Sequence, residues 1–339
     1  MTGPPDSTSG RLKVGIIGAG SMGSVHATGW QQTGADIVGI HAPGSRRAAG
    51  LADSVGAAVF EELDDLLTEV DVLDICAPTH RHFDQISAAA AAGRHVICEK
   101  PLALSTAEAT EAQRVCQAAG VRLLVAHVVR FFPEYVTARQ RVRAGDIGEV
   151  AVIRLNRLGY QPGGDQDWFR DVKKSGGVVF DLMIHDFDFA RWLSGDITTV
   201  YAKSVRTGHP DMADHVLAIL EHESGALTHV QGSWALPPPT FRTAFEIAGS
   251  GGLITFDSEQ QAPLRYSRSV TEVADVPAPG SPLAESPWTT ELRHFADVLS
   301  GRAEALVTAE DAVAAVRIAE AAAESITSGE PVVLSGASS

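Results

Sequence analysis

A chain of 339 residues is long enough for about two domains at roughly 150 residues each. Hydrophobic residues make up 45% of it and charged residues 20%, a composition that excludes an intrinsically disordered chain. The 27 Lys and Arg residues face 42 Asp and Glu residues, which gives a net charge of −15. Because this charge repels phosphates and anionic headgroups, nucleic acid and membrane surfaces are poor partners.

The cysteines and the N-terminus indicate a cytoplasmic protein. Cys76, Cys98 and Cys116 form no C-x-x-C pair, which argues against a disulfide framework and against structural zinc. No apolar run reaches the roughly 18 residues that a membrane helix needs. Residues 1–10 lack the pattern of a signal peptide, and we expect them to form a loose tail.

The first half alternates short β-branched runs with Ala-rich stretches that are long enough for crossover helices. Runs that are apolar throughout are typical of strands covered on both faces, so we expect a parallel, doubly wound Rossmann domain over residues 11–128. The predicted strands are 12–17, 35–40, 70–75, 94–98 and 121–126.

The second half, residues 129–339, has a different pattern. Its strands cluster together, which predicts an α+β domain with an open, largely antiparallel mixed sheet. The predicted strands are 149–158, 198–205, 215–222, 226–234, 243–250 and 252–257, and the predicted helices are 133–145, 181–193, 288–300 and 308–328. Residues 237–239 and 277–282 are predicted to form loops.

The motif G-A-G-S-M-G follows the first strand and opens a helix. Gly18 permits a tight turn, Gly20 lets a pyrophosphate approach the backbone, and Gly23 allows close packing between helix and strand. Ser21 and Met22 lie between them in the first helical turn, where backbone amides and the helix dipole favour an anion. In this position the motif predicts a dinucleotide-binding site.

The residues after the second strand bear on the choice of cofactor. An acidic residue is typical there of proteins that bind the ribose hydroxyl of NAD, but this chain has Ala42. Ser45 and Arg46 follow closely and could bind the 2′-phosphate of NADP. The pattern favours NADP over NAD, although Arg46 could also be part of an ordinary solvated helix start.

Two further segments follow strands of the first domain, where open α/β sheets bind ligands. Pro78, Thr79 and His82 follow the third predicted strand, and Glu99 and Lys100 follow the fourth. We expect these residues to contribute to the cofactor site, with the Lys100 ammonium available to stabilise a developing alkoxide. The alternative is a surface lysine paired with Glu99.

Asp181 and His185 lie four residues apart in a predicted helix and so share one face. A carboxylate beside an imidazole orients the ring and stabilises its charged form, as a general base requires. A capping aspartate with a core histidine is one alternative. A metal site that adds Asp186 and Asp188 is another, but adjacent helical residues diverge and no supporting ligand motif is present. We therefore expect no metal.

Four other residues are weaker candidates for substrate binding. His127 and Arg130 fall at the expected junction of the domains and could face a crevice or tie the domains together. Trp168 and Arg170 precede a Gly-Gly turn in a polar loop, where an aromatic face and a guanidinium could hold a polyol or serve in packing alone.

Taken together, the glycine motif, P-T-H-x-H, E-K-P and GG(x)3D(x)3HD(x)D resemble the Gfo/Idh/MocA family over most of the chain. The resemblance implies a Rossmann domain, a second domain whose open sheet forms homodimers or homotetramers, and a site in which Lys100, Asp181 and His185 surround the reacting carbon. Ala42 departs from the family's usual Asp and Thr79 from its usual Asn, and the first change puts NAD in doubt.

The resemblance and the candidate residues together predict an NAD(P)-dependent dehydrogenase that oxidises a secondary hydroxyl of a sugar or cyclic polyol. Two alternatives remain open. One is a redox-neutral enzyme that cleaves glycosides by transient oxidation. The other is a cofactor-binding sensor without chemistry.

Overall fold

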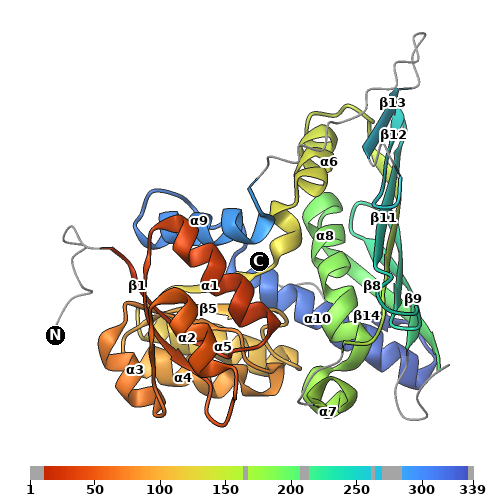
Figure 1. Cartoon of the computed structure of the whole chain (residues 1–339). Helices are drawn as coiled ribbons and strands as arrows, with labels where there is room; N and C mark the ends of the chain where they lie inside the picture. Colours follow the sequence, from red (N-terminus) through yellow and green to blue (C-terminus); the bar gives the residue numbers. More distant parts are fainter. Residues whose placement is uncertain (1–10, 163–166, 207–213, 261–263, 269–284, 335–339) are drawn as a thin grey trace. The chain divides into compact units, whose positions relative to one another are not determined.

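The computed structural model describes residues 11–162, 167–206, 214–260, 264–268 and 285–334 (Figure 1). The expected tail at 1–10 and the expected loop at 277–282 lie outside these residues. The chain divides into two compact units: unit 1 contains residues 1–131 and 285–313, and unit 2 contains residues 132–284 and 314–339. None of the helices in the described parts has the length and apolar character that a membrane crossing requires.

Unit 1 contains a six-stranded parallel sheet in the order β3-β2-β1-β4-β5-β6. All five expected strands are present, within two residues at each end, and β3 is an additional strand of two residues. The strands are β1 (Lys13–Ile17), β2 (Asp36–His41), β3 (Ala58–Val59), β4 (Val72–Ile75), β5 (His95–Glu99) and β6 (Leu123–Ala126). The predicted doubly wound fold is confirmed.

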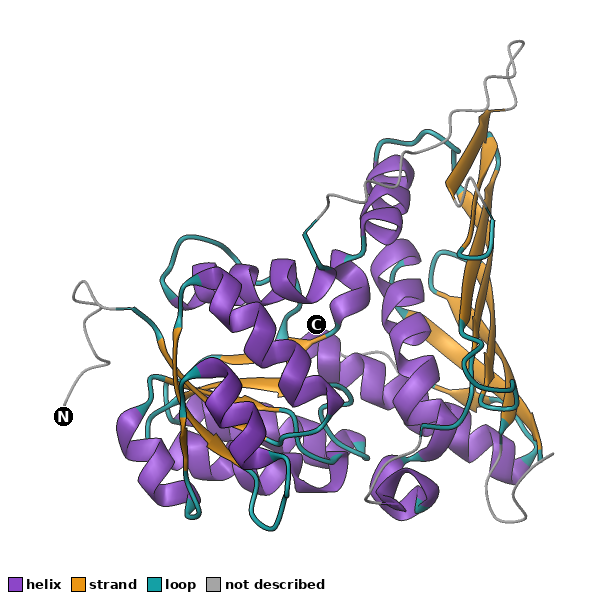
Figure 2. Ribbon diagram, in the orientation of Figure 1, coloured by secondary structure: helices purple, strands orange, loops and turns teal. Residues whose placement is uncertain are grey.

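Helices cover both faces of this sheet (Figure 2). They are α1 (Ser21–Thr33), α2 (Ala48–Val55), α3 (Leu63–Glu69), α4 (His82–Ala91) and α5 (Thr106–Ala118), with short 3₁₀ turns η1 (Thr79–Arg81) and η2 (Val128–Phe131). Every residue of β4 and β6 is buried, which explains why these strands are apolar on both faces. Asp74 in β4 is also buried, but it is a charged residue in this otherwise apolar strand.

Unit 1 also contains the later helix α9 (Pro287–Leu299), which packs against α1. Its Leu292 and Phe295 join the core that holds Trp30 and the sheet. A Cβ atom on Gly29 of α1 would lie 2.6 Å from Leu292 Cδ1, so glycine allows the close approach. The sequence pattern places α9 with the second domain. A helical pattern identifies an apolar face but does not specify which surface covers it.

Unit 2 contains an eight-stranded mixed sheet in the order β13-β12-β11-β7-β10-β9-β8-β14. Among the described strands, β10 and β7 pair in parallel and the other pairs are antiparallel. The strands are β7 (Val150–Leu158), β8 (Ile197–Val205), β9 (His215–His222), β10 (Leu227–Ser233), β11 (Arg242–Gly249), β12 (Gly252–Asp257), β13 (Leu264–Arg268) and β14 (Val332–Val333). The predicted mixed, largely antiparallel sheet is confirmed, and β13 and β14 are additional.

The helices of unit 2 lie on one side of this sheet (Figure 2). They are α6 (Pro133–Arg143), α7 (Val172–Ser175), α8 (Ile184–Ser194) and α10 (Ala309–Ser328), of which the first residues of α10 belong to unit 1, with the 3₁₀ turn η3 (Asp167–Arg170) and the π-helical turn η4 (Val179–Met183). Side chains of β9 alternate, with Val216, Ala218 and Leu220 buried. Leu217 and Ile219 point to the other face and are 44% and 46% exposed.

Candidate active site

The glycine loop after β1 combines two crowded positions with one open position. Gly18 has a φ of 100°, and a Cβ on it would lie 2.5 Å from the Cys76 carbonyl oxygen. A Cβ on Gly23 would lie 2.1 Å from the Gly18 carbonyl oxygen. A Cβ on Gly20 would meet no described atom within 4 Å. Gly18 and Gly23 therefore hold the loop closed, while the backbone at Gly20 borders open space.

The N-terminus of α1 is suited to an anion. Gly20 is its N-cap, no side chain caps it, and its first turn contains no acidic residue. Ser21 and Met22 begin the helix, so their backbone amides belong to the positive end of the helix dipole. Together with the open backbone at Gly20, these features fit the pyrophosphate of a dinucleotide.

The chain turns sharply after β2. His41 is buried and its Nδ1 lies 3.0 Å from the Phe60 carbonyl oxygen. Ala42 accepts a hydrogen bond from the Ser45 backbone N–H at 3.0 Å, and Arg46 at the end of this turn is exposed. The turn therefore presents a methyl group, a hydroxyl and a guanidinium, and no carboxylate lies between His41 and Arg46 in the sequence.

His82 links the two segments that follow β4 and β5. Its Nε2 lies 2.9 Å from the Ala77 carbonyl oxygen and its Nδ1 lies 2.9 Å from the Pro101 carbonyl oxygen. Burial lowers the pKa of His82, although both carbonyl oxygens favour the charged ring. Thr79 is buried beside it in η1, after Pro78. The expected cofactor-binding roles of these residues stay predictions.

Lys100 follows β5 and is anchored through its backbone. Glu99 is 7% exposed, and its Oε2 accepts the Lys100 backbone N–H at 3.0 Å. Its Oε1 lies 3.2 Å from His26 Nε2. Burial would raise the pKa of Glu99, but the close contact with His26, its charge and the charge of Lys100 lower it. Glu99 is therefore a buried carboxylate held by the His26 ring and by the Lys100 backbone.

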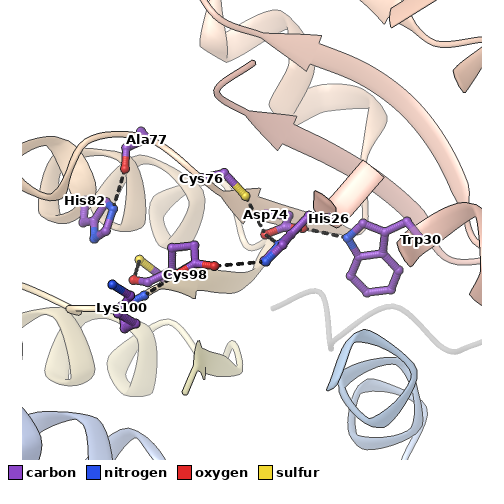
Figure 3. A network of polar contacts seen from close by, with 9 residues as sticks. His26, Trp30, Asp74, Cys76, Ala77, His82, Cys98 and Lys100 are labelled. Carbon is purple, nitrogen blue, oxygen red and sulfur yellow. Dashed lines mark hydrogen bonds and ion pairs between the residues drawn. The ribbon is translucent and has the colours of Figure 1, made fainter. Parts of the chain in front are cut away.

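The network continues through His26 to the centre of unit 1 (Figure 3). His26 Nδ1 lies 3.0 and 2.9 Å from the two carboxylate oxygens of Asp74, and Trp30 Nε1 donates to Asp74 at 2.7 Å. His26 and Asp74 are both fully buried. Burial would lower the pKa of His26, but Asp74 raises it well above the ordinary value.

Asp181 and His185 lie on the partly exposed side of a helical segment whose other residues are mostly buried. The sequence predicts a helix from residue 181, whereas the segment begins at Val179 with the π-helical turn η4 and continues as α8. Such turns are frequent at functional sites. Because Lys100 belongs to unit 1 and these two residues belong to unit 2, their meeting at one site stays a prediction.

The neighbouring aspartates considered as metal ligands lie on the buried side. Asp186 and Asp188 are each 1% exposed, and Asp186 forms an ion pair with Arg157. Among the described residues, one group of possible metal ligands has its ligand atoms within 4.8 Å of one another, namely His26, Asp74 and Cys76. The Nδ1 atom of His26 faces the Asp74 carboxylate at hydrogen-bonding distance, and burial raises the pKa of the Cys76 thiol to about 12.

The weaker substrate candidates occupy different environments. Arg130 is 1% exposed, and its Nη1 donates to Asp311 Oδ2 and to the Leu306 carbonyl oxygen, both at 2.9 Å. His127, three residues earlier in the sequence, is also buried. Trp168 stacks on Phe169 with ring centroids 3.9 Å apart, and Arg170 is exposed. Arg130 therefore ties η2 to residues 306–311 within unit 1, and the four substrate roles stay predictions.

The fold and the glycine loop define an oxidoreductase with an NAD-binding Rossmann domain, and family models agree. Residues 12–127 match the model described as "Oxidoreductase family, NAD-binding Rossmann fold", and residues 135–255 match the "GFO/IDH/MocA C-terminal domain". The chain belongs to the Gfo/Idh/MocA family.

Similar proteins cover nearly the whole chain. The scyllo-inositol 2-dehydrogenase (NAD(+)) of Bacillus subtilis is 29% identical, over 96% of this chain and 96% of its own length. The D-xylose 1-dehydrogenase (NADP(+)) 2 of Haloferax volcanii is 28% identical, over 95% of this chain and all of its own. The crystal structure of GenD2 from gentamicin A biosynthesis, in complex with NAD, is 28% identical with a TM-score of 0.85, over 99% of this chain and 100% of that chain.

The sequence motifs do not indicate a role for His26 and Asp74, yet the positions of both residues in the sequence suggest a buried polar contact. Asp74 is an acidic residue inside an otherwise apolar strand, where a buried charge needs a partner. His26 and Trp30 are four residues apart on the helix that opens with the glycine motif, so both can reach one acceptor.

Proposed function

We propose that this protein is an NAD(P)-dependent dehydrogenase that reversibly oxidises a secondary hydroxyl of a sugar or cyclic polyol to a ketone. One observation carries the proposal. The glycine loop follows β1 and Lys100 follows β5 of the same parallel sheet, so both lie at its carboxyl edge. A cation at that edge can act on a substrate oxygen beside a bound dinucleotide.

Residues of unit 1 would hold the cofactor. The backbone at Gly20, Ser21 and Met22 binds the pyrophosphate, and the turn from Ala42 to Arg46 receives the adenosine ribose. Absence of a carboxylate at Ala42 together with the exposed Arg46 supports NADP as the preferred form. The bound nicotinamide supplies the hydride acceptor.

Three side chains would carry the proton chemistry. Lys100 donates a hydrogen bond to the substrate oxygen and stabilises the negative charge that develops there. His185 removes the hydroxyl proton, and Asp181 orients the imidazole and stabilises its charged form. The same groups return the proton when a ketone is reduced.

A parallel screen tests this function. A panel of cyclic polyols, aldoses and glycosides is incubated with NAD or NADP, while reduced cofactor and any released aglycone are measured. We expect reduced cofactor with at least one polyol or aldose. Lys100→Met and His185→Asn should each lower kcat by roughly 10²- to 10⁴-fold. The control Lys13→Met changes an exposed lysine at the start of β1 and should keep wild-type turnover.

The same screen contains the results that would overturn the proposal. A folded, cofactor-binding protein that reduces neither cofactor with any substrate contradicts it. Aglycone release without net cofactor reduction would instead indicate redox-neutral glycoside cleavage.

Assembly and location complete the proposal. The exposed face of the unit 2 sheet carries Leu217 and Ile219, and their exposure supports a homodimer or homotetramer formed through this face. All three cysteines are free thiols, which supports a reducing, cytoplasmic location.

A further inference from the structure

A continuous set of buried contacts connects the helix of the glycine loop to Lys100 (Figure 3). His26 lies on α1, which begins directly after Gly20. Its two ring nitrogens face two different carboxylates: Asp74 on β4 at 2.9 Å and Glu99 at the end of β5 at 3.2 Å. One imidazole therefore joins three elements of unit 1.

The last contact of this set is on the backbone of Lys100. Glu99 uses one carboxylate oxygen for His26 and the other for the Lys100 N–H, at 3.0 Å. The ion pair at one oxygen and the hydrogen bond at the other restrict the rotation of the carboxylate, and the carboxylate in turn restrains the backbone that donates to it. The backbone of Lys100 is thus linked to His26 through the Glu99 carboxylate.

The electrostatics of the site favour a charged His26. Asp74 and Glu99 are buried carboxylates, and unpaired buried charges are costly. A protonated imidazole donates to Asp74 through Nδ1 and forms an ion pair with Glu99 through Nε2, whereas a neutral ring carries no charge to balance either carboxylate. Asp74 also accepts from Trp30 at 2.7 Å, which fixes its position independently of His26.

We infer that His26 is a positioning residue for Lys100, acting through the Glu99 carboxylate. The inference rests on the proposed catalytic role of Lys100 and deepens it. In this arrangement the helix that receives the cofactor phosphates and the turn that carries the catalytic ammonium are parts of one rigid unit. Loss of the His26 to Glu99 contact should therefore affect the chemical step more than binding of the cofactor.

Two variants separate this role from simple core stability. His26→Gln places an amide nitrogen near the position of Nε2, within reach of Glu99. His26→Asn reaches only the position of Nδ1, so it can donate to Asp74 but not to Glu99. Both remove the imidazolium charge and both leave Trp30 to support Asp74, which makes them a matched pair.

Hydrogen exchange of the Lys100 amide provides a readout that needs neither substrate nor cofactor. This amide donates to Glu99, so its exchange rate reports the contact directly. We expect exchange at Lys100 to be at least tenfold faster in His26→Asn than in the wild type, with His26→Gln in between. The Val96 amide of β5, which donates to the Arg122 carbonyl oxygen at 2.8 Å, serves as the internal control and should change much less.

Kinetics supply the second readout. We expect kcat to fall in the order wild type, His26→Gln, His26→Asn, with a loss of about tenfold or more in the last. The Kd for NADP and the KM for the polyol should stay within about threefold. The inference would be overturned if the two variants had equal kcat and equal Lys100 exchange and differed only in Tm. His26 would then have a purely structural role.

Two further outcomes keep the inference and the proposed function apart. Fast Lys100 exchange in His26→Asn, in a protein that oxidises no polyol, supports the link and overturns the function. Polyol oxidation that both variants retain supports the function and overturns the link. Stoichiometric zinc in the purified wild-type protein, lost in His26→Asn, would also overturn the inference, because His26 would then be a metal ligand.

Discussion

Arg157 and Asp186 form a buried, bidentate ion pair in unit 2, with Nε 3.0 Å from Oδ2 and Nη2 2.9 Å from Oδ1. Arg157 comes from β7 and Asp186 from α8, directly after His185. Nη2 also donates to the Tyr135 hydroxyl at 3.2 Å. The pair therefore attaches the helix that carries the predicted base to the sheet beneath it.

Asp186→Asn should strongly destabilise the protein, because it leaves the Arg157 guanidinium buried without a counter-charge. We expect the free energy of unfolding in urea to fall by about 3–5 kcal/mol. The exposed pair of Arg302 and Asp297 is the control, and Asp297→Asn should cost less than about 1 kcal/mol. Equal losses in the two variants would show that the buried pair has no special importance for stability.

Ala42→Asp should change the cofactor preference. A carboxylate after β2 repels the 2′-phosphate of NADP and accepts a hydrogen bond from the ribose hydroxyl of NAD. We expect the ratio of kcat/KM for NADP to that for NAD to fall by about tenfold or more, which corresponds to roughly 1.4 kcal/mol. Arg46→Gln should weaken the binding of NADP and leave the binding of NAD nearly unchanged. An unaltered kcat/KM ratio in both variants would contradict this binding mode.

Glu291 on α9 is fully buried, and neither of its carboxylate oxygens has a hydrogen-bond partner among the described residues. Burial, followed by the charge of Glu99, raises its pKa well above the ordinary value. Between the ordinary pKa and this raised pKa, the folded state holds a proton that the unfolded state has lost. The contribution of Glu291 to stability is therefore complete below the ordinary pKa and is lost as the pH rises toward the raised one.

Glu291→Met should remove this pH dependence. We expect it to raise the free energy of unfolding by about 1–3 kcal/mol at pH 8 and by less at pH 5. Urea titrations at both pH values measure the difference. Glu304→Gln changes an exposed glutamate and should alter neither value, whereas an equal effect of Glu291→Met at both pH values would refute the assignment.

The open face of the unit 2 sheet gives a prediction about assembly. Leu217→Glu combined with Ile219→Glu places charges on two exposed positions of β9. If this face joins subunits, light scattering after size exclusion should show an oligomer for the wild type and a monomer for the double variant. Val59→Glu, on an exposed residue of unit 1, should leave the mass unchanged.

Most of the fold could be predicted from the sequence because its signals are local. The strands of unit 1 are continuous apolar runs between helical stretches, and the turn at Gly18 requires glycine. Strands β3 and β14 have two residues each, too short for any periodicity. The π-helical turn around Asp181 depends on hydrogen-bond register, which side-chain spacing does not specify.

The site was predictable only where a motif stood next to a strand end. Gly20 and Lys100 follow strands, and their places on the sheet edge follow from the strand order. The contact of His26 with Glu99 joins residues 73 positions apart and depends on the packing of α1 on the sheet. No local pattern in the sequence encodes such a contact.

The return of α9 to unit 1 has a consequence during synthesis on the ribosome. Roughly 150 residues, 132–284, are translated between the two segments of unit 1, which takes about 8–30 s at 5–20 residues per second. During that interval the face of α1 around Trp30 has not yet received Leu292 and Phe295. The core of unit 1 therefore stays partly exposed to solvent until the ribosome has synthesised most of unit 2.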